Sequence, residues 1–159
     1  MFIKERTDLN EVNVTTDVHT DVAVPAEKHA ALGTIATILS TNRPISADEL
    51  RDNLIAREDE SSTGFGNGVA IPHAKVNGLT EPFVGVVTFK QPVAWDSLDG
   101  QPVSIAIVLV MPDQNGADKL HLKMLSKLAR KLMDDDFIKA LKDAQHDGSQ
   151  MTKVLDRVL

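Results

Sequence analysis

The stretch PVSIAIVLVM, residues 102–111, is rich in Val and Ile. Such a continuous apolar run is typical of a β-strand that is buried on both faces. The stretch PFVGVVTF, residues 82–89, has the same character, and Asp99-Gly100 supplies turn chemistry between the two. These two segments therefore predict neighbouring strands in a buried sheet.

Helical patterns lie on either side of these strands along the chain. Residues 25–40 carry apolar side chains at helical spacing, and we expect Pro25 in the first turn. Residues 44–59 predict a second helix, in which Ser46 is the candidate N-cap and Glu49 completes a capping box.

The C-terminal part of the chain is predicted to be helical as well. Residues 116–136 have the clearest helical period, and short helices are expected at 135–144 and 149–159. The apolar face expected for the helix at 116–136 consists of Leu122, Leu125, Leu128, Ala129 and Leu132.

The remaining segments are shorter. Residues 1–18 are interpreted as a tail or short strand, and HTDVAV, residues 19–24, alternates weakly enough to be an edge strand. SSTGFGNG, residues 61–68, is a loop by composition, and VAI, residues 69–71, is a short buried strand that Pro72 ends. The order of elements predicts an α/β fold: a single three-layer α/β/α domain, residues 19–159, with helices on both faces of a mixed β-sheet.

Composition excludes several classes of function. The 159 residues suit one domain, and a formal net charge of −6 without a basic cluster argues against nucleic-acid binding. The chain has no Cys, which excludes disulfides, Cys-ligated zinc and thiol catalysis. Neither a signal peptide nor a long apolar run is evident, so we expect a cytoplasmic protein that does not insert into a membrane.

Three alternating glycines, Gly64, Gly66 and Gly68, precede the pair Pro72-His73. The spacing matches neither the dinucleotide fingerprint nor the Walker loop. Glycine allows a backbone to approach a ligand closely, but a plain tight turn explains the run equally well.

Two histidines are candidates for chemistry. His73 follows a rigid proline and is either a nucleophile or an ordinary histidine. His121 is expected in the first turn of its helix, pointing inward, where the helix dipole favours an anion; a core histidine bonded to a carbonyl is the alternative. No His-Glu-x-x-His or Gly-x-Ser-x-Gly motif is present, so neither a zinc site nor a serine hydrolase is indicated.

Two long motifs resemble one known family. They are LIAREDESSTGFGNGVAIPHAKV, residues 54–76, and PVAWDSLDGQPVSIAIVLVMP, residues 92–112, the latter followed by KLHLKMLSKLARKLMDDDFIKAL. Together they resemble the IIA components of the bacterial phosphoenolpyruvate-dependent sugar phosphotransferase system, in the fructose–mannitol class. Nitrogen-regulatory IIA proteins share both motifs. The resemblance covers about residues 22–157, and Ala74 stands where a glycine is common.

The resemblance implies a role for each matching residue. His73 falls on the phosphorylated histidine, His121 on the second histidine beside it, and Arg57 on an arginine near the active centre. Thr63 falls on the motif's threonine, and backbone N–H groups of Gly64, Gly66 and Gly68 can complete a phosphate cradle.

The implied partners are the small phosphocarrier HPr as donor and a IIB domain as acceptor, with no cofactor and no metal. Sugar transport and a regulatory role both remain open. For the docking surface, the residues that we expect are Phe65, Val76 and Trp95 with an acidic rim at Asp96 and Asp99; a place in the core is the alternative for Trp95.

Overall fold

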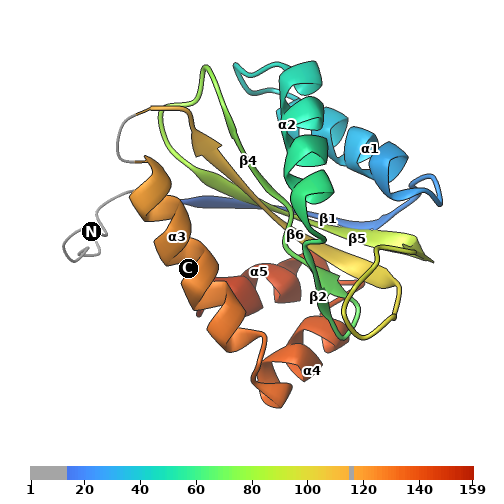
Figure 1. Cartoon of the computed structure of the whole chain (residues 1–159). Helices are drawn as coiled ribbons and strands as arrows, with labels where there is room; N and C mark the ends of the chain where they lie inside the picture. Colours follow the sequence, from blue (N-terminus) through green and yellow to red (C-terminus); the bar gives the residue numbers. More distant parts are fainter. Residues whose placement is uncertain (1–13, 115–116) are drawn as a thin grey trace.

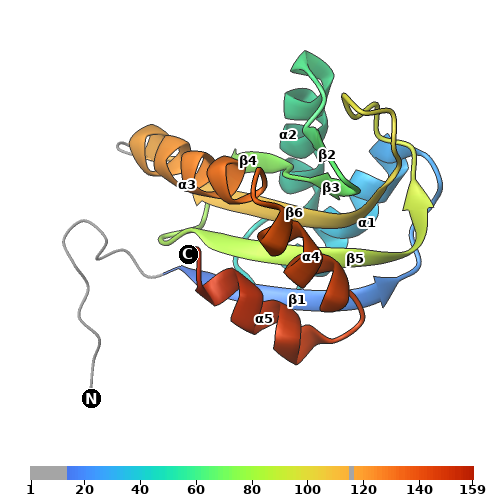
Figure 2. The same ribbon diagram turned by 90° about the horizontal axis from the view of Figure 1, so that it is seen from below.

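The computed structural model describes residues 14–114 and 117–159, and a six-stranded mixed sheet forms its middle layer (Figures 1 and 2). The strand order is β1-β5-β6-β3-β2, and β4 also pairs with β6. The strands are β1 (Thr15–Val22), β2 (Gly64–Gly66), β3 (Val69–Ala70), β4 (His73–Val76), β5 (Phe83–Val93) and β6 (Val103–Pro112).

The two Val-rich strands lie at the centre, as predicted. β5 and β6 pair antiparallel, with Val87 opposite Ala106, and every residue of β6 except Ser104 is buried. β3 and β4 both pair parallel with β6, so the sheet is mixed. β6 is therefore the strand on which the neighbouring short strands are assembled.

Helices cover both faces of the sheet, which confirms the predicted three-layer α/β/α architecture (Figure 2). One apolar core lies between the sheet and the first two helices, and a second lies between the sheet and the last three. The helices are α1 (Lys28–Ser40), α2 (Ala47–Glu60), α3 (Ala117–Lys131), α4 (Asp135–Asp143) and α5 (Gly148–Asp156).

Both of the first two helices begin directly after an N-cap residue, and the position of Pro25 does not mark the start of α1. Ser46 caps α2 as predicted, because its side chain accepts the backbone N–H of Glu49. The Glu49 carboxylate instead accepts the backbone N–H of Asn77 at 3.1 Å. Pro25 is not in the first turn of α1; the helix begins after Glu27, whose carboxylate accepts two backbone N–H groups.

The apolar face of α3 differs from the predicted one. Leu122 is 65% exposed, whereas Met124, Leu128 and Leu132 are buried against the sheet. The prediction holds at Leu125, Leu128 and Leu132, which all pack against this core, and is wrong at Leu122. His121 lies in the second turn, since α3 begins at Ala117, so the dipole argument for a first-turn histidine no longer applies.

The N-terminal edge strand is present and begins earlier than expected. β1 runs parallel to β5, with Thr15 opposite Phe83, so the boundary predicted after residue 18 falls inside this strand. The tail is predicted over residues 1–18, and residues 1–13 of it lie outside the described part of the chain.

The glycine run is a β-hairpin and not a loop. β2 and β3 pair antiparallel around Asn67 and Gly68, whose φ angles are 57° and 82°. Two successive residues with positive φ are typical of a type I′ turn, and Asn-Gly is the sequence that this turn prefers. The segment before His73 is therefore a defined piece of sheet.

Candidate active site

His73 begins β4, directly after a break in the edge of the sheet. β3 ends at Ala70 and β4 resumes at His73, both paired with β6, and His73 lies opposite Leu109. The carbonyl of Pro72 accepts the backbone N–H of Leu109 at 3.0 Å. The proline thus joins two short strands and holds the histidine against the central strand.

Both ring nitrogens of His73 have partners. Nδ1 lies 2.9 Å from the carbonyl oxygen of Ile71, and Nε2 lies 2.9 Å from Nε of Arg57. A carbonyl can only accept and the Arg57 Nε–H can only donate, so the proton is on Nδ1 and the lone pair is on Nε2. The hydrogen bonds therefore fix one tautomer.

The environment keeps this ring neutral. His73 is 6% exposed, and burial lowers the pKa of its imidazole to about 4. The Ile71 carbonyl opposes this change, nearby His121 and Arg57 reinforce it, and Glu58 opposes it. A neutral imidazole with an electron pair on Nε2 can act as a nucleophile. Here that pair accepts a hydrogen bond from Arg57, so Nε2 can attack only when this bond opens.

His121 lies beside His73, as expected. Their ring centroids are 4.6 Å apart with an angle of 59° between the planes. Within the described residues, Nε2 of His121 is buried without a hydrogen-bond partner. Burial lowers the pKa of His121, with a further contribution from Lys75.

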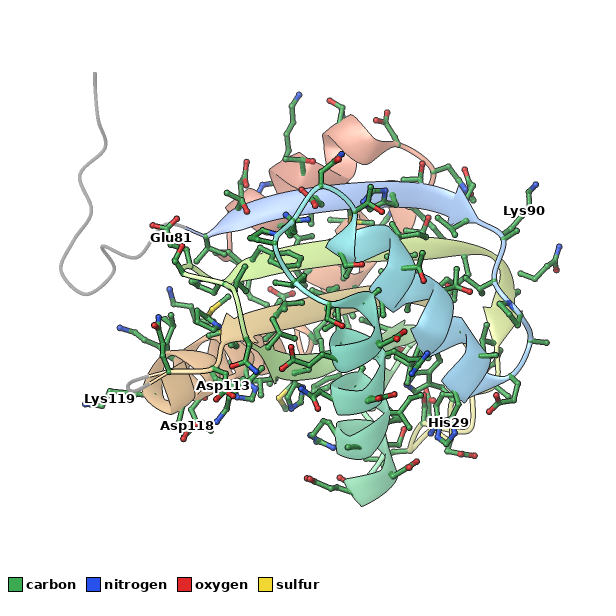
Figure 3. All side chains as sticks on the ribbon, turned by 90° about the horizontal axis from the view of Figure 1, so that it is seen from above. His29, Glu81, Lys90, Asp113, Asp118 and Lys119 are labelled. Atoms are coloured by element: carbon green, nitrogen blue, oxygen red, sulfur yellow. The ribbon has the colours of Figure 1, made fainter. Side chains whose placement is uncertain are left out.

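An ion pair lies next to His121. Lys75 of β4 contacts Asp118 at the start of α3, and Asp113 and Asp118 lie at the same end of the sheet (Figure 3). The pair joins the strand that carries His73 to the helix that carries His121.

Arg57 belongs to the last turn of α2. Its Nε–H donates to His73, and its Nη1 donates to the carbonyl of Ser61 at 2.9 Å. The guanidinium is therefore anchored from the backbone while it covers Nε2 of His73.

The predicted phosphate cradle is only partly assembled. Thr63 is buried, and its hydroxyl donates to Glu58 at 2.5 Å. The N–H of Gly64 donates to Ser62 at 3.0 Å. Gly64 borders the cleft at His73, whereas Gly66 and Gly68 are not among the residues that line it.

An open cleft of about 640 Å³ lies over His73. Leu98, which is 98% exposed, stands at its edge together with Phe65 and Asp96. Val76 and Trp95 do not contribute to this surface as expected, because both are buried in the core. The residues that line the cleft are Arg57, Ser61, Ser62, Thr63, Gly64, Phe65, Ile71, His73, Asp96, Leu98 and Leu125.

Sequence reasoning missed two residues at this site. A single Leu beside a turn carries no signal, so the sequence does not single out Leu98. Glu58, whose carboxylate is fully buried beneath the cleft, belongs to the motif but no role is predicted for it. The one signal in the sequence for Glu58 is its position directly after the candidate Arg57 near the end of a predicted helix.

A family comparison matches residues 14–157 to the phosphoenolpyruvate-dependent sugar phosphotransferase system, EIIA 2. The chain belongs to this family. The match includes the hairpin, both histidines and Arg57.

Relatives carry two kinds of name. A nitrogen regulatory protein of Pseudomonas aeruginosa is 38% identical over 125 residues, covering 77% of this chain and 80% of its own. A fructose-like EIIA component of the phosphotransferase system of Escherichia coli is 33% identical over 132 residues, covering 82% of this chain and 86% of its own.

Solved structures share the fold. Nitrogen regulatory protein IIA-Ntr from Neisseria meningitidis superimposes with a TM-score of 0.74 at 28% identity, covering 87% of this chain and 92% of its own. Enzyme IIA for mannitol from Escherichia coli, in complex with phosphorylated IIB, gives 0.67 at 15% identity, covering 89% and 94%. Among the described residues, no helix is both long and apolar enough to cross a bilayer.

Proposed function

We propose that this protein is a phosphocarrier that accepts a phosphoryl group on Nε2 of His73 from phospho-HPr and passes it to a IIB component. The observation that carries the proposal is the neutral, tautomerically fixed His73 at the floor of an open cleft. Family membership supports the phosphotransfer chemistry.

The transfer can be written with a single change of bonds. The Nε2 lone pair attacks phosphorus, a new N–P bond forms, and the bond to the donor's histidine nitrogen breaks. Nδ1 keeps its proton throughout and donates it in a hydrogen bond to the Ile71 carbonyl, so His73 later leaves as a neutral imidazole when the acceptor attacks. No proton has to be removed from His73 in either direction.

Arg57 must release Nε2 before the attack. Its Nε–H and Nη groups then become donors for the phosphoryl oxygens, for which a planar guanidinium is well suited. The hydrogen bond to the Ser61 carbonyl keeps the side chain near the site during this change. The resting structure thus protects the nucleophile, and an incoming phosphoryl group replaces it as the partner of Arg57.

His121 is placed to stabilise the transferring group. Its unpartnered Nε2 is buried close to His73, and burial favours the neutral ring. With a proton on Nε2, this ring would donate to a phosphoryl oxygen where solvation is poorest.

The cleft edge is suited to protein partners. Leu98 and Leu122 are exposed near the two histidines, and exposed apolar side chains around a reactive group are typical of a docking surface. Asp96 and Asp99 add negative charge for a basic partner face. HPr and IIB would use this surface in turn.

A regulatory role is the second candidate. The 38% identity to a nitrogen regulatory protein favours it. In this alternative, phosphorylation of His73 changes binding to a target protein and no sugar transporter is supplied.

Transfer from phospho-HPr tests the proposal. Label should enter the wild-type protein and be mapped to His73 under conditions that spare phosphohistidine. His73→Ala should fold and take up none, and undiminished labelling of that variant would refute the assignment. Discharge of the labelled protein to a IIB component then separates transport from regulation, because a purely regulatory IIA should retain its label.

A further inference from the structure

A buried carboxylate is connected to the ring of His73 by consecutive hydrogen bonds. Glu58 of α2 has a side chain with no exposed surface, and its two oxygens accept the N–H of Thr63 at 2.8 Å and its hydroxyl at 2.5 Å. The carbonyl of Thr63 accepts the N–H of Ile71 at 3.0 Å. The carbonyl of Ile71 accepts Nδ1–H of His73 at 2.9 Å.

Each bond in this series holds the acceptor of the next one. Glu58 fixes Thr63 where the chain enters the hairpin, and Thr63 fixes Ile71 where the chain leaves it. Ile71 precedes Pro72, and its carbonyl is turned to the ring of His73. A shift at Glu58 would therefore move the carbonyl that selects the tautomer.

The carboxylate itself is held firmly. Nζ of Lys28 lies 3.3 Å from Glu58 and also donates to the carbonyl of Trp95 at 3.4 Å. Nε1–H of Trp95 donates to the hydroxyl of Thr63 at 3.3 Å. A buried carboxylate is costly unless it is fully hydrogen-bonded, and here both oxygens are used.

We propose that Glu58 is a positioning residue, which acts through Thr63 and Ile71 to keep the proton of His73 on Nδ1 and the lone pair on Nε2. This inference rests on the phosphocarrier function proposed above. Glu58 is fully buried and does not line the cleft over His73, so it acts through its hydrogen bonds and not by contact with a phosphoryl group. Together with Arg57, which donates to the lone pair on Nε2, it sets which nitrogen of His73 is the nucleophile.

The negative charge of Glu58 also favours the phosphoryl transfer proposed for His73. Its negative charge raises the pKa of His73, against the larger lowering by burial. The charge therefore stabilises positive charge on the ring, which develops when Nε2 forms a bond to phosphorus while Nδ1 keeps its proton.

The first test is the variant Glu58→Gln. Its amide cannot accept both Thr63 bonds, because one of its two end groups is a donor. We expect ¹⁵N spectra of the wild-type ring to show a single Nδ1–H tautomer and those of the variant to show a mixture. Losing a hydrogen bond to a charged group should slow uptake from phospho-HPr by about tenfold.

Glu60→Gln is the matched control. Glu60 is exposed at the end of the same helix, so the change in charge is the same but the hydrogen-bond series is untouched. This control should keep the wild-type tautomer and rate. A merely structural role for Glu58 would lower stability without changing the tautomer ratio.

A second pair of variants covers the case in which Glu58→Gln does not fold. Thr63→Val removes the hydroxyl bond to Glu58, and Thr63→Ser keeps it. The valine variant should show the mixed tautomer, and the serine variant should lie closer to wild type. A single Nδ1–H tautomer with wild-type uptake in Glu58→Gln, or in Thr63→Val if the former is unfolded, would overturn the proposal.

Failure of the phosphocarrier function would be visible separately. If the wild-type protein takes no label from phospho-HPr, that function is refuted, while the ring spectra still report whether Glu58 sets the tautomer.

Discussion

The low pKa of His73 predicts a measurable loss of stability in mild acid. The ordinary value for the histidine side chain is 6.5, and burial lowers the pKa of the folded imidazole to about 4. Between these values the unfolded chain binds a proton that the folded chain does not. The stability that comes from a neutral His73 is therefore complete above pH 6.5 and is lost as the pH falls toward 4.

The size of the effect follows from these two pKa values. Lowering the pH from 7 to 5 should cost about 2 kcal/mol of unfolding free energy through His73. Carboxylates and His121, whose pKa is also lowered, add their own pH dependence. A variant without His73 keeps the carboxylates and His121, so the difference in pH dependence between the wild type and this variant isolates the contribution of His73.

Urea unfolding of the wild type and of His73→Gln at pH 7 and pH 5 measures the difference. The wild type should lose about 2 kcal/mol more than the variant between the two pH values. An NMR titration of the ring should find the imidazole neutral down to about pH 5. Equal losses in the two proteins, or a ring that titrates near 6.5, would refute the argument from burial.

Three further variants test the site and its frame. Arg57→Lys should slow uptake from phospho-HPr by about tenfold or more, because Lys lacks the paired N–H donors of the planar guanidinium. The label should remain on His73, and an unaltered rate would make Arg57 a structural residue. His121→Ala should still take up the label but discharge it to IIB more slowly; wild-type rates in both steps, or label on His121 in the native protein, would contradict its supporting role. Gly64→Ala should destabilise the fold by about 1–3 kcal/mol in urea, since a Cβ there would overlap Ser97. Ser97→Gly should recover part of that loss, and no recovery would show that the clash is not the cause.

The three layers of the fold could be predicted from the sequence because the apolar residues of the strands and helices are, for the most part, the residues that are buried. β6 is buried on both faces, and its sequence is apolar at every position except Ser104. At Leu122 the same reasoning fails, because this apolar residue lies on the exposed side of α3, whereas Met124 and Leu128 face the sheet. For Trp95 the structure decides in favour of the core alternative. The sequence leaves both places open, since an isolated aromatic residue has no period that distinguishes core from surface.

The candidate site was only partly accessible to sequence reasoning. His73, His121 and Arg57 carry motif signals, and the structure brings the three side chains together. The Asn-Gly pair within the glycine run is a hairpin signal that composition alone, which predicts a loop, does not reveal. The bonds from Glu58 to the ring run through backbone groups, which no side-chain pattern records.

The break at Ile71 and Pro72 has a consequence for how the site moves. Reactive residues often lie on loops, which open locally at low free energy and exchange their amide hydrogens quickly. His73 instead lies on a strand paired with the buried β6, and the N–H of Leu109 is bonded within this break. That amide should exchange as slowly as the slowest in the sheet. If the protein is the phosphocarrier proposed above, it would then present the same backbone to donor and acceptor, before and after it is loaded. Adaptation would fall to side chains such as Arg57 and to the visiting partner.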